Sequence, residues 1–573
     1  MKLEVKGGNQ TARISVSEHI VGSADGIFYL DVTMTNEMAE VPEPFKVRWQ
    51  VPSVDCYSVW SPQHRNMRSL GVNWSMKKTK SRLASSMPIQ LLVSASGRNR
   101  LNVSLSDAAT PISIGMGIIE ENGNFLCEVE FFTQPTTPID FYNALIRIDT
   151  RDVMYYDSIY DTVSWWENEC GYISAPVPEH ARLPMNSLWY SFHQKLDVDE
   201  IVRQCALSKP IGMDTVIVDD GWQTDDNNRG YAYCGDWEVA ASKIPDMKEL
   251  VRRVHETGMK FILWYSVPAI GVRSRAYERF KDMLLERDGD WKPIDPRYKE
   301  AREYLVKLYT DAVRDWELDG LKLDFIDSFA LRGASLIPDE RRDYQSLEDA
   351  VDALMREITE SLKTLNPDIL IEFRQSYVGP VIRKYGNMLR VGDCPNCALL
   401  NRCDVINLRL TSGKTAVHSD MVMWNYDDTV ESAALQLASI IYSVPQISML
   451  IDKLSPDHRE MLEFYLSFWR ANRDVLLDGK LTALSPESSY SSAASEMDGE
   501  KILSLYTDSV VEQYDGRLTV VNASGNTSII FKGFSQRGYI VLDCMGNTVE
   551  EGSFDACAIS ELYVPVAGMV IVD

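Results

Sequence analysis

The sequence lacks the features that mark several protein classes. No run reaches the roughly 18 apolar residues that span a bilayer, and its first ten residues, MKLEVKGGNQ, contain no apolar stretch like that of a signal peptide. It also has no GxGxxG after a strand-like run and no HExxH or DxDxDG. We therefore expect a cytoplasmic protein with no cofactor, nucleotide-dependent redox chemistry or catalytic metal.

Positive charge is also scarce. Lys and Arg number 58 against 83 Asp and Glu, which gives a net charge of -25 at pH 7. Such a surface repels phosphate backbones and anionic lipids, so we expect no nucleic-acid partner and no membrane partner. A neutral substrate fits this charge better, although solubility alone accounts for most of these carboxylates.

The ten cysteines do not form the dense framework of a small disulfide-stapled domain, and free thiols are expected. Cys394, Cys397 and Cys403 have a spacing that could begin a zinc site, and His418 is the one tempting addition. A fourth ligand at matching spacing is missing, so we predict no metal site.

Three segments differ in their hydrophobic pattern. Short alternating runs with Gly, Asn and Pro turns predict an N-terminal β-sandwich over residues 1–178, beginning with TARISVSEHIV and showing only a weak helical signal until PIDFYNALIRI. A similar pattern, from KILSLYTDS to LYVPVAGMVIVD, predicts a small C-terminal β-sandwich over residues 481–573.

Between them, over residues 179–480, strand-like runs alternate with amphipathic segments, which is typical of βα units. Eight strands close a TIM barrel, and we therefore predict a central (β/α)8 barrel. The predicted strands are MNSLWYSF, MDTVIVDDGW, KFILWYSVP, GLKLDFID, ILIEFRQSY, MLRVGDCPN, AVHSDMVMW and QISMLIDKL.

Active sites of such barrels lie at the carboxyl ends of the strands, where this sequence is rich in polar residues. In GLKLDFID, alternation places Lys322 and Asp324 on the same face of the strand. A nearby Lys favours an ionised carboxylate, as a nucleophile requires, although a self-satisfied structural ion pair has the same spacing.

Asp393, after Gly392 and close to Arg390, is the second catalytic candidate. A proton donor needs a raised pKa, which we expect from the surrounding aspartates; the alternative is a carboxylate that caps the next helix. Asp219 and Asp220 end the second strand, where alternation points one into the barrel, while the other points away or caps the turn before Gly221. Paired carboxylates bind sugar hydroxyls or metals, and the absence of accompanying metal motifs favours sugar.

Tryptophans at or near the strand ends could stack on a pyranose or simply pack in the core. They are Trp165, Trp166, Trp222, Trp237, Trp264 and Trp424.

The succession IVDDGWQ, GDWEVAASKIPDMKELVRRVHETGMKFILWYS, GLKLDFID and RVGDCPN resembles the α-galactosidase clan of retaining glycoside hydrolases, in particular glycoside hydrolase family 36, the melibiases and raffinose-synthase-like enzymes. The resemblance implies double displacement, with Asp324 as nucleophile and Asp393 as acid/base. It further implies substrate binding by Asp219, Asp220 and Lys322, with Trp264 and Arg390 as additional positions.

The chain departs from the family pattern in three places. Leu323 replaces a common Trp, RQSYVGP replaces a Cys and Gly-Gly-Arg turn after the fifth strand, and Gly-Asp-Cys-Pro-Asn replaces the usual acid/base segment. Around the second of these, Arg374 and Ser376 are expected to bind substrate, with Gly379 as an alternative for the recognition made there.

The leading hypothesis is a retaining, exo-acting α-glycosidase for galactose-type sugars, with an oligosaccharide or glycoside substrate and a possible homo-oligomer. An α-N-acetylgalactosaminidase or other α-glycosidase, and a raffinose-synthase-like transglycosylase, are alternatives that share the residues and mechanism. A non-catalytic carbohydrate-binding relative would have lost a catalytic carboxylate, whereas Asp324 and Asp393 are both present.

Overall fold

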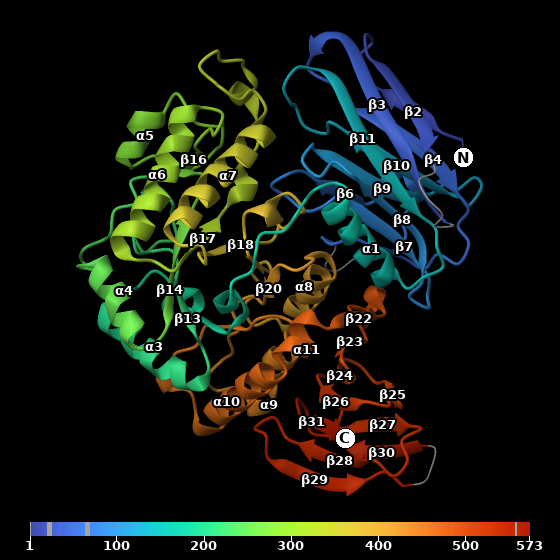
Figure 1. The fold of residues 1–573 in the computed structure, drawn as a ribbon, viewed down its shortest axis with the longest axis vertical. Helices are drawn as coiled ribbons and strands as arrows, with labels where there is room; N and C mark the ends of the chain where they lie inside the picture. Colours follow the sequence, from blue (N-terminus) through green and yellow to red (C-terminus); the bar gives the residue numbers. More distant parts are fainter. Residues whose placement is uncertain (1, 20–25, 64–68, 556–558) are drawn as a thin grey trace.

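The computed structural model describes residues 2–19, 26–63, 69–555 and 559–573. Two antiparallel sheets, a parallel barrel and two further sheets follow one another along the chain (Figure 1). The predicted architecture, a (β/α)8 barrel between two β-sandwiches, is confirmed. Ile20 and Val21, which end the first predicted strand, lie outside the described residues.

The N-terminal sheets pack face to face around a core of inward-pointing apolar residues that includes Leu30, Val47, Trp49 and Ile146. One sheet has the order β1 (Glu4–Gly7), β4 (Phe45–Val51), β10 (Phe125–Phe131), β9 (Ile112–Ile118), β6 (Lys78–Ser81). The other has the order β2 (Arg13–His19), β3 (Ile27–Glu40), β11 (Ile139–Asp149), β8 (Asn99–Leu105), β7 (Ile89–Val93), β5 (Ser58–Trp60).

The helical signal expected in PIDFYNALIRI is wrong. Residues Ile139–Asp149 form β11, which pairs with β3 on one side and β8 on the other, so ladder pairing on both edges overrides local propensity. The first helix is instead α1 (Tyr155–Asn168), whose aromatic side chains contact two parts of the protein. Trp166 donates to the Leu105 carbonyl at 2.7 Å and Tyr160 to the Leu481 carbonyl at 2.8 Å.

All eight predicted barrel strands are present among the described residues, although most are shorter than their apolar runs. In chain order they are β12 (Met185–Ser187), β13 (Thr215–Val218), β14 (Lys260–Ser266), β17 (Gly320–Asp324), β18 (Leu370–Arg374), β19 (Met388–Arg390), β20 (Ala416–His418) and β21 (Gln446–Ile447). Parallel bridges from His418 to Val444 and from Val422 to Ile447 close the barrel beside β21.

Several barrel helices begin at polar caps and bury one apolar stripe. Asp197 caps α3, Asp246 caps α4 and Ser346 caps α7, each by accepting from a backbone N–H three residues on. The helices are α2 (Trp189–Phe192), α3 (Val198–Ile211), α4 (Met247–Glu256), α5 (Arg275–Phe280), α6 (Lys299–Trp316), α7 (Leu347–Leu365), α8 (Ala398–Thr411), α9 (Val430–Ser439), α10 (Pro456–Ala471) and α11 (Arg473–Asp478). β15 (Ala269–Gly271) and β16 (Trp291–Pro293) pair as a separate two-stranded antiparallel sheet.

The C-terminal sheets have their own core, which includes Val520, Phe531 and Val541. The larger sheet has the order β22 (Lys480–Leu484), β23 (Ser492–Met497), β24 (Glu500–Leu505), β26 (Arg517–Asn522), β31 (Met569–Val572), β28 (Gly538–Leu542), β29 (Thr548–Ser553). The smaller has the order β25 (Val510–Glu512), β27 (Ser528–Lys532), β30 (Ile559–Tyr563). No helix in the described part of the chain is both long and apolar enough to cross a membrane.

Candidate active site

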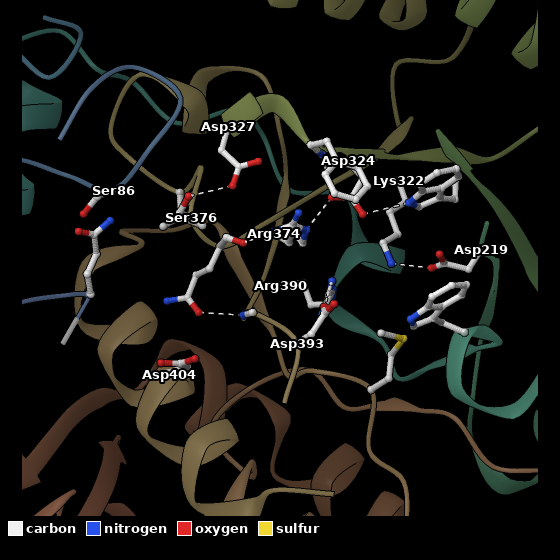
Figure 2. Close-up of a pocket in the computed structure, with 18 of the residues that line it drawn as sticks. Ser86, Asp219, Lys322, Asp324, Asp327, Arg374, Ser376, Arg390, Asp393 and Asp404 are labelled. Carbon is white, nitrogen blue, oxygen red and sulfur yellow. Dashed lines mark hydrogen bonds and ion pairs between the residues drawn. The ribbon is translucent and has the colours of Figure 1, made fainter. Parts of the chain in front are cut away.

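A cavity of about 580 Å³ lies at the carboxyl ends of the barrel strands (Figure 2). The structure brings every site residue predicted from the sequence to its wall. These are Asp219, Asp220, Trp264, Lys322, Asp324, Arg374, Ser376, Arg390 and Asp393.

Asp324 ends β17 and is held by donors from two neighbouring strands or the loops after them. Its Oδ1 accepts from Arg374 Nε at 2.6 Å and from the Tyr377 hydroxyl at 3.0 Å. Its Oδ2 accepts from Trp264 Nε1 at 3.0 Å. Oδ1 is therefore the more heavily bonded oxygen, and Oδ2 keeps more capacity for a ligand.

The charge of Asp324 is fixed by its cationic neighbours. Burial alone would raise the pKa of this carboxyl, but Arg374 and then Lys322 outweigh it and hold the pKa well below its ordinary range. Lys322 acts at a distance, because its Nζ donates to Asp219 Oδ2 at 2.5 Å instead of to Asp324. Strand parity identified the shared face correctly, but the direct partner comes from the adjacent strand β18.

Asp219 and Asp220 both line the cavity, so neither points away from it, and Asp220 also accepts from the Gly221 backbone N–H in the turn, which was the alternative expected for it. Strand β13 ends at Val218, and strand alternation no longer governs the two residues after it. Asp220 accepts from Gln194 Nε2 and Gln223 Nε2, both at 2.7 Å, and burial raises its pKa to about 6.

Gly221 permits this turn. Its φ is +113°, and a Cβ there would lie 2.6 Å from the Gln194 Cα. Only glycine tolerates both the conformation and the close approach. The DDG sequence therefore positions the aspartates as well as supplying them.

Asp393 lies in the loop after β19 with its side chain 57% exposed. Arg390 NH2 donates to its Oδ1 at 2.9 Å, and this guanidinium holds the pKa of Asp393 below its ordinary value. The expectation that neighbouring aspartates raise the pKa of Asp393 is therefore wrong. Asp393 does not cap α8 either, because that helix begins after Cys397.

The guanidinium group of Arg390 is buried and interacts with three carboxylates, those of Asp393, Asp420 and Glu372. Its NH1 donates to Asp420 Oδ1 at 2.6 Å, and its Nε lies 3.7 Å from Glu372 Oε1. Burial raises the pKa of Asp420, which also accepts from the Tyr190 hydroxyl at 3.0 Å. Arg390 therefore lines the cavity and holds Asp393 in place, and it is itself held by the buried carboxylates of Asp420 and Glu372.

Several lining residues were not predicted. Some come from the N-terminal β-sandwich, which sequence patterns gave no reason to connect with strand ends in the barrel, and others from α2 or from loops between barrel elements. The lining residues that no motif indicated include Pro62, Gln63, Ser86, Met87, Trp189, Tyr231, Phe325 and Met421.

Trp264 is the one tryptophan of the predicted set that lines the cavity; the others pack in cores or against the barrel. Among the described residues, no group of three His, Cys, Asp or Glu side chains is arranged to hold a metal ion. His418 Nε2 faces the Ala181 carbonyl oxygen at 2.8 Å, and Cys403 Sγ lies 3.6 Å from the Ser489 carbonyl oxygen.

Residues 179–375 match the family model named Melibiase. The match contains the Asp219–Asp220 pair and Asp324, and it ends before Arg390 and Asp393.

Two curated relatives align with part of the chain. The bifunctional alpha-galactosidase/sucrose kinase AgaSK of Mediterraneibacter gnavus is 32% identical over 145 residues, which cover 24% of this chain and 15% of that protein. Alpha-galactosidase Mel36A of Lactobacillus acidophilus is 30% identical over 148 residues, 24% of this chain and 19% of that protein. The alignments therefore span less than a fifth of these relatives.

The fold resembles that of a solved structure along its whole length. The alpha-galactosidase AgaA variant of Geobacillus stearothermophilus, in complex with raffinose, superimposes with a TM-score of 0.64. It shares 14% sequence identity, and the alignment covers 100% of this chain and 86% of that one.

Proposed function

Because this chain belongs to the melibiase family, we propose that it is a retaining, exo-acting α-glycosidase that removes terminal α-linked galactose-type sugars from oligosaccharides or glycosides. The observation that carries the proposal is the state of Asp324. It is a buried carboxylate, kept ionised by two cations, at the wall of a cavity large enough for a terminal sugar.

Asp324 is the nucleophile in this mechanism. Its Oδ2 attacks the anomeric carbon and the glycosidic C–O bond breaks, while Asp393 gives its proton to the departing oxygen. In the second step Asp393 takes a proton from water, the water oxygen bonds to the anomeric carbon, and the ester bond to Asp324 breaks. The two inversions return the α configuration.

Asp393 is supported as acid/base by its exposed position in the cavity wall. Arg390 favours the ionised form of Asp393. A bound sugar would displace water from the Asp393 carboxyl and so raise its pKa towards that of a proton donor. Hydroxyls at the far end of the sugar meet Asp219, Asp220 and Lys322, which supply charged acceptors and a charged donor.

A panel of 4-nitrophenyl α-glycosides, including the galactoside and the 2-acetamido-galactoside, tests the proposal. We expect turnover of the galactoside with retention of configuration. NMR of the first-formed product, before it mutarotates, measures its anomeric configuration. Asp324→Asn preserves the shape of the side chain and should abolish turnover while the protein remains folded by circular dichroism. Near-normal rates in this variant would refute the mechanism.

A further inference from the structure

The interior of the barrel contains a polar layer directly below the cavity. Along β18, alternation places Leu370, Glu372 and Arg374 on one face of the strand. Leu370 packs in an apolar cluster with the first residues of other barrel strands, and Arg374 lines the cavity, so Glu372 lies between the two. Barrel interiors are ordinarily filled by branched apolar side chains. Here the five strands from β17 to β21 each contribute one buried polar side chain to the layer: Lys322, Glu372, Arg390, His418 and Gln446.

One side of the layer is neutral and fixes the direction of its hydrogen bonds. His418 Nε2 faces an acceptor, the Ala181 carbonyl oxygen, so this nitrogen carries the ring proton. Burial lowers the pKa of His418 to about 4, and its Nδ1 accepts from Gln446 Nε2 at 3.2 Å. The second proton of the Gln446 amide goes to Glu372 Oε2. The amide cannot reverse, because both of its partners are acceptors, and Glu372 is therefore held by a donor of fixed direction.

The other side of Glu372 faces two cations. Strand β18 lies between β17 and β19, which carry Lys322 and Arg390. Glu372 is the register partner of Lys322, and its Oε1 lies 3.7 Å from Arg390 Nε. Among the described residues neither of these two atoms has a hydrogen-bond partner, so charge alone joins them. Lys322 and Arg390 repel each other and Glu372 attracts both, which makes it their shared counter-ion.

The same two cations act on Asp393. Arg390 has the largest effect in lowering the pKa of this carboxyl, and Lys322 adds to it. Glu372 and Asp393 lie on opposite sides of one guanidinium group, since Arg390 Nε faces the first and NH2 donates to the second. A carboxylate behind the guanidinium offsets part of the positive charge in front of it. Glu372 is not part of the cavity wall, so its influence on Asp393 passes through the two cations and their charge.

We propose that Glu372 is a positioning residue of the site, the shared counter-ion that limits the pull of Lys322 and Arg390 on Asp393 and so keeps a proton available for the departing oxygen. This inference rests on the proposed glycosidase function and adds to it a residue outside the cavity. Burial raises the pKa of Glu372, whereas Lys322, Arg390 and Gln446 favour its carboxylate. Charged and titratable groups facing Glu372 are Lys322, Arg390, Asp219 and, through Gln446, His418; those facing Asp393 are Arg390, Lys322, Arg374, Asp420 and Tyr190.

The test is the pH profile of kcat/KM on a methyl α-glycoside of the sugar that the nitrophenyl panel identifies, because a poor leaving group needs the Asp393 proton. Glu372→Gln keeps the size of the side chain and removes its charge. Carboxylates that flank one guanidinium lie within about 10 Å, where a unit charge at an effective dielectric constant of about 20 shifts a pKa by about 1 unit. Asp393 should therefore lose its proton at lower pH, and the alkaline limb should move to lower pH by about 1 unit.

Two further variants control for the substitution. Glu372→Asp keeps the charge and should leave the alkaline limb near its wild-type position. Glu348, in the first turn of α7, is another largely buried carboxyl that is not part of the cavity wall, and Glu348→Gln should not move the limb. If Glu372→Gln does not fold, Glu372→Asn against Glu372→Asp makes the same comparison with a shorter side chain, which leaves room for water beside the cations.

A purely structural role for Glu372 would lower kcat/KM by the same factor at every pH, and such a uniform loss would overturn the proposal. An unchanged profile in Glu372→Gln would also overturn it, because Glu372 would then carry no charge at the working pH. Equal shifts in Glu372→Asp and Glu372→Gln would do the same. If the wild type turns over no glycoside, the proposed function itself fails; turnover with an unshifted alkaline limb refutes the role of Glu372 alone.

Discussion

Replacing Arg374 should raise the pKa of the nucleophile. Arg374 Nε lies 2.6 Å from Asp324 Oδ1, and both side chains are largely buried, with 18% and 9% of their area exposed. Opposite charges about 4 Å apart interact by about 4 kcal/mol at an effective dielectric constant of about 20. If water entering the variant halves this, about 2 kcal/mol remains, which corresponds to about 1.5 pKa units.

In the proposed mechanism Asp324 must be ionised to attack, so activity is lost as the pH falls through its pKa. In the wild type this pKa is well below the ordinary range, and in Arg374→Met it rises. The acidic limb of kcat/KM should therefore move to higher pH by about 1.5 units in the variant.

The assay is a pH profile of kcat/KM on a nitrophenyl α-glycoside, with Arg374→Lys as the control that keeps the charge. A limb near pH 6 that is common to all three proteins belongs to Asp220, whose pKa is about 6. If Arg374→Met lowers kcat/KM by the same factor at every pH, Arg374 contributes to substrate binding and does not lower the pKa of Asp324, and the reasoning is refuted.

Three further predictions concern other parts of the site. Asp393→Ala should lower kcat/KM on natural oligosaccharides by about 10²- to 10⁴-fold but barely affect aryl glycosides with good leaving groups; equal losses would move the acid/base role to Asp327 or Asp420. Asp420→Asn removes a charge that competes for Arg390, so the pKa of Asp393 falls further and the alkaline limb of kcat/KM shifts to lower pH; an unshifted limb would refute this coupling. Gly221→Ala should lower the free energy of unfolding by about 1–3 kcal/mol in thermal denaturation. Gly258→Ala, whose Cβ would meet no atom closer than 3.4 Å, should cost less, and equal costs would contradict the role of the Gln194 contact.

The sequence predicted the barrel because its strands are marked twice, by apolar runs and by polar residues at their carboxyl ends. It predicted the lining residues for the same reason, since strand order in a closed barrel brings those ends together. Residues Ile139–Asp149 were misread because pairing on both edges, which no local pattern records, decides their conformation.

Charge states were harder to predict than positions. Lys322 was expected to favour the ionised form of Asp324, which it does from a distance, whereas the direct contact is made by Arg374, a residue that spacing within one strand did not indicate. The pKa of Asp393 was expected to rise, and the nearness of Arg390 lowers it. Both differences arise from side-chain directions between strands, which residue spacing within one strand does not determine.

The same cations explain how one carboxyl could serve first as an acid and then as a base. Lys322 and Arg374 lower the pKa of Asp393 as well as that of Asp324. While Asp324 is ionised, its negative charge offsets these cations, and a sugar that covers Asp393 favours the protonated form needed for the first step. When Asp324 becomes an ester, its charge disappears and the uncompensated cations favour the Asp393 carboxylate. The proposed double displacement would thus lower the pKa of its own acid/base at the point where a base is required.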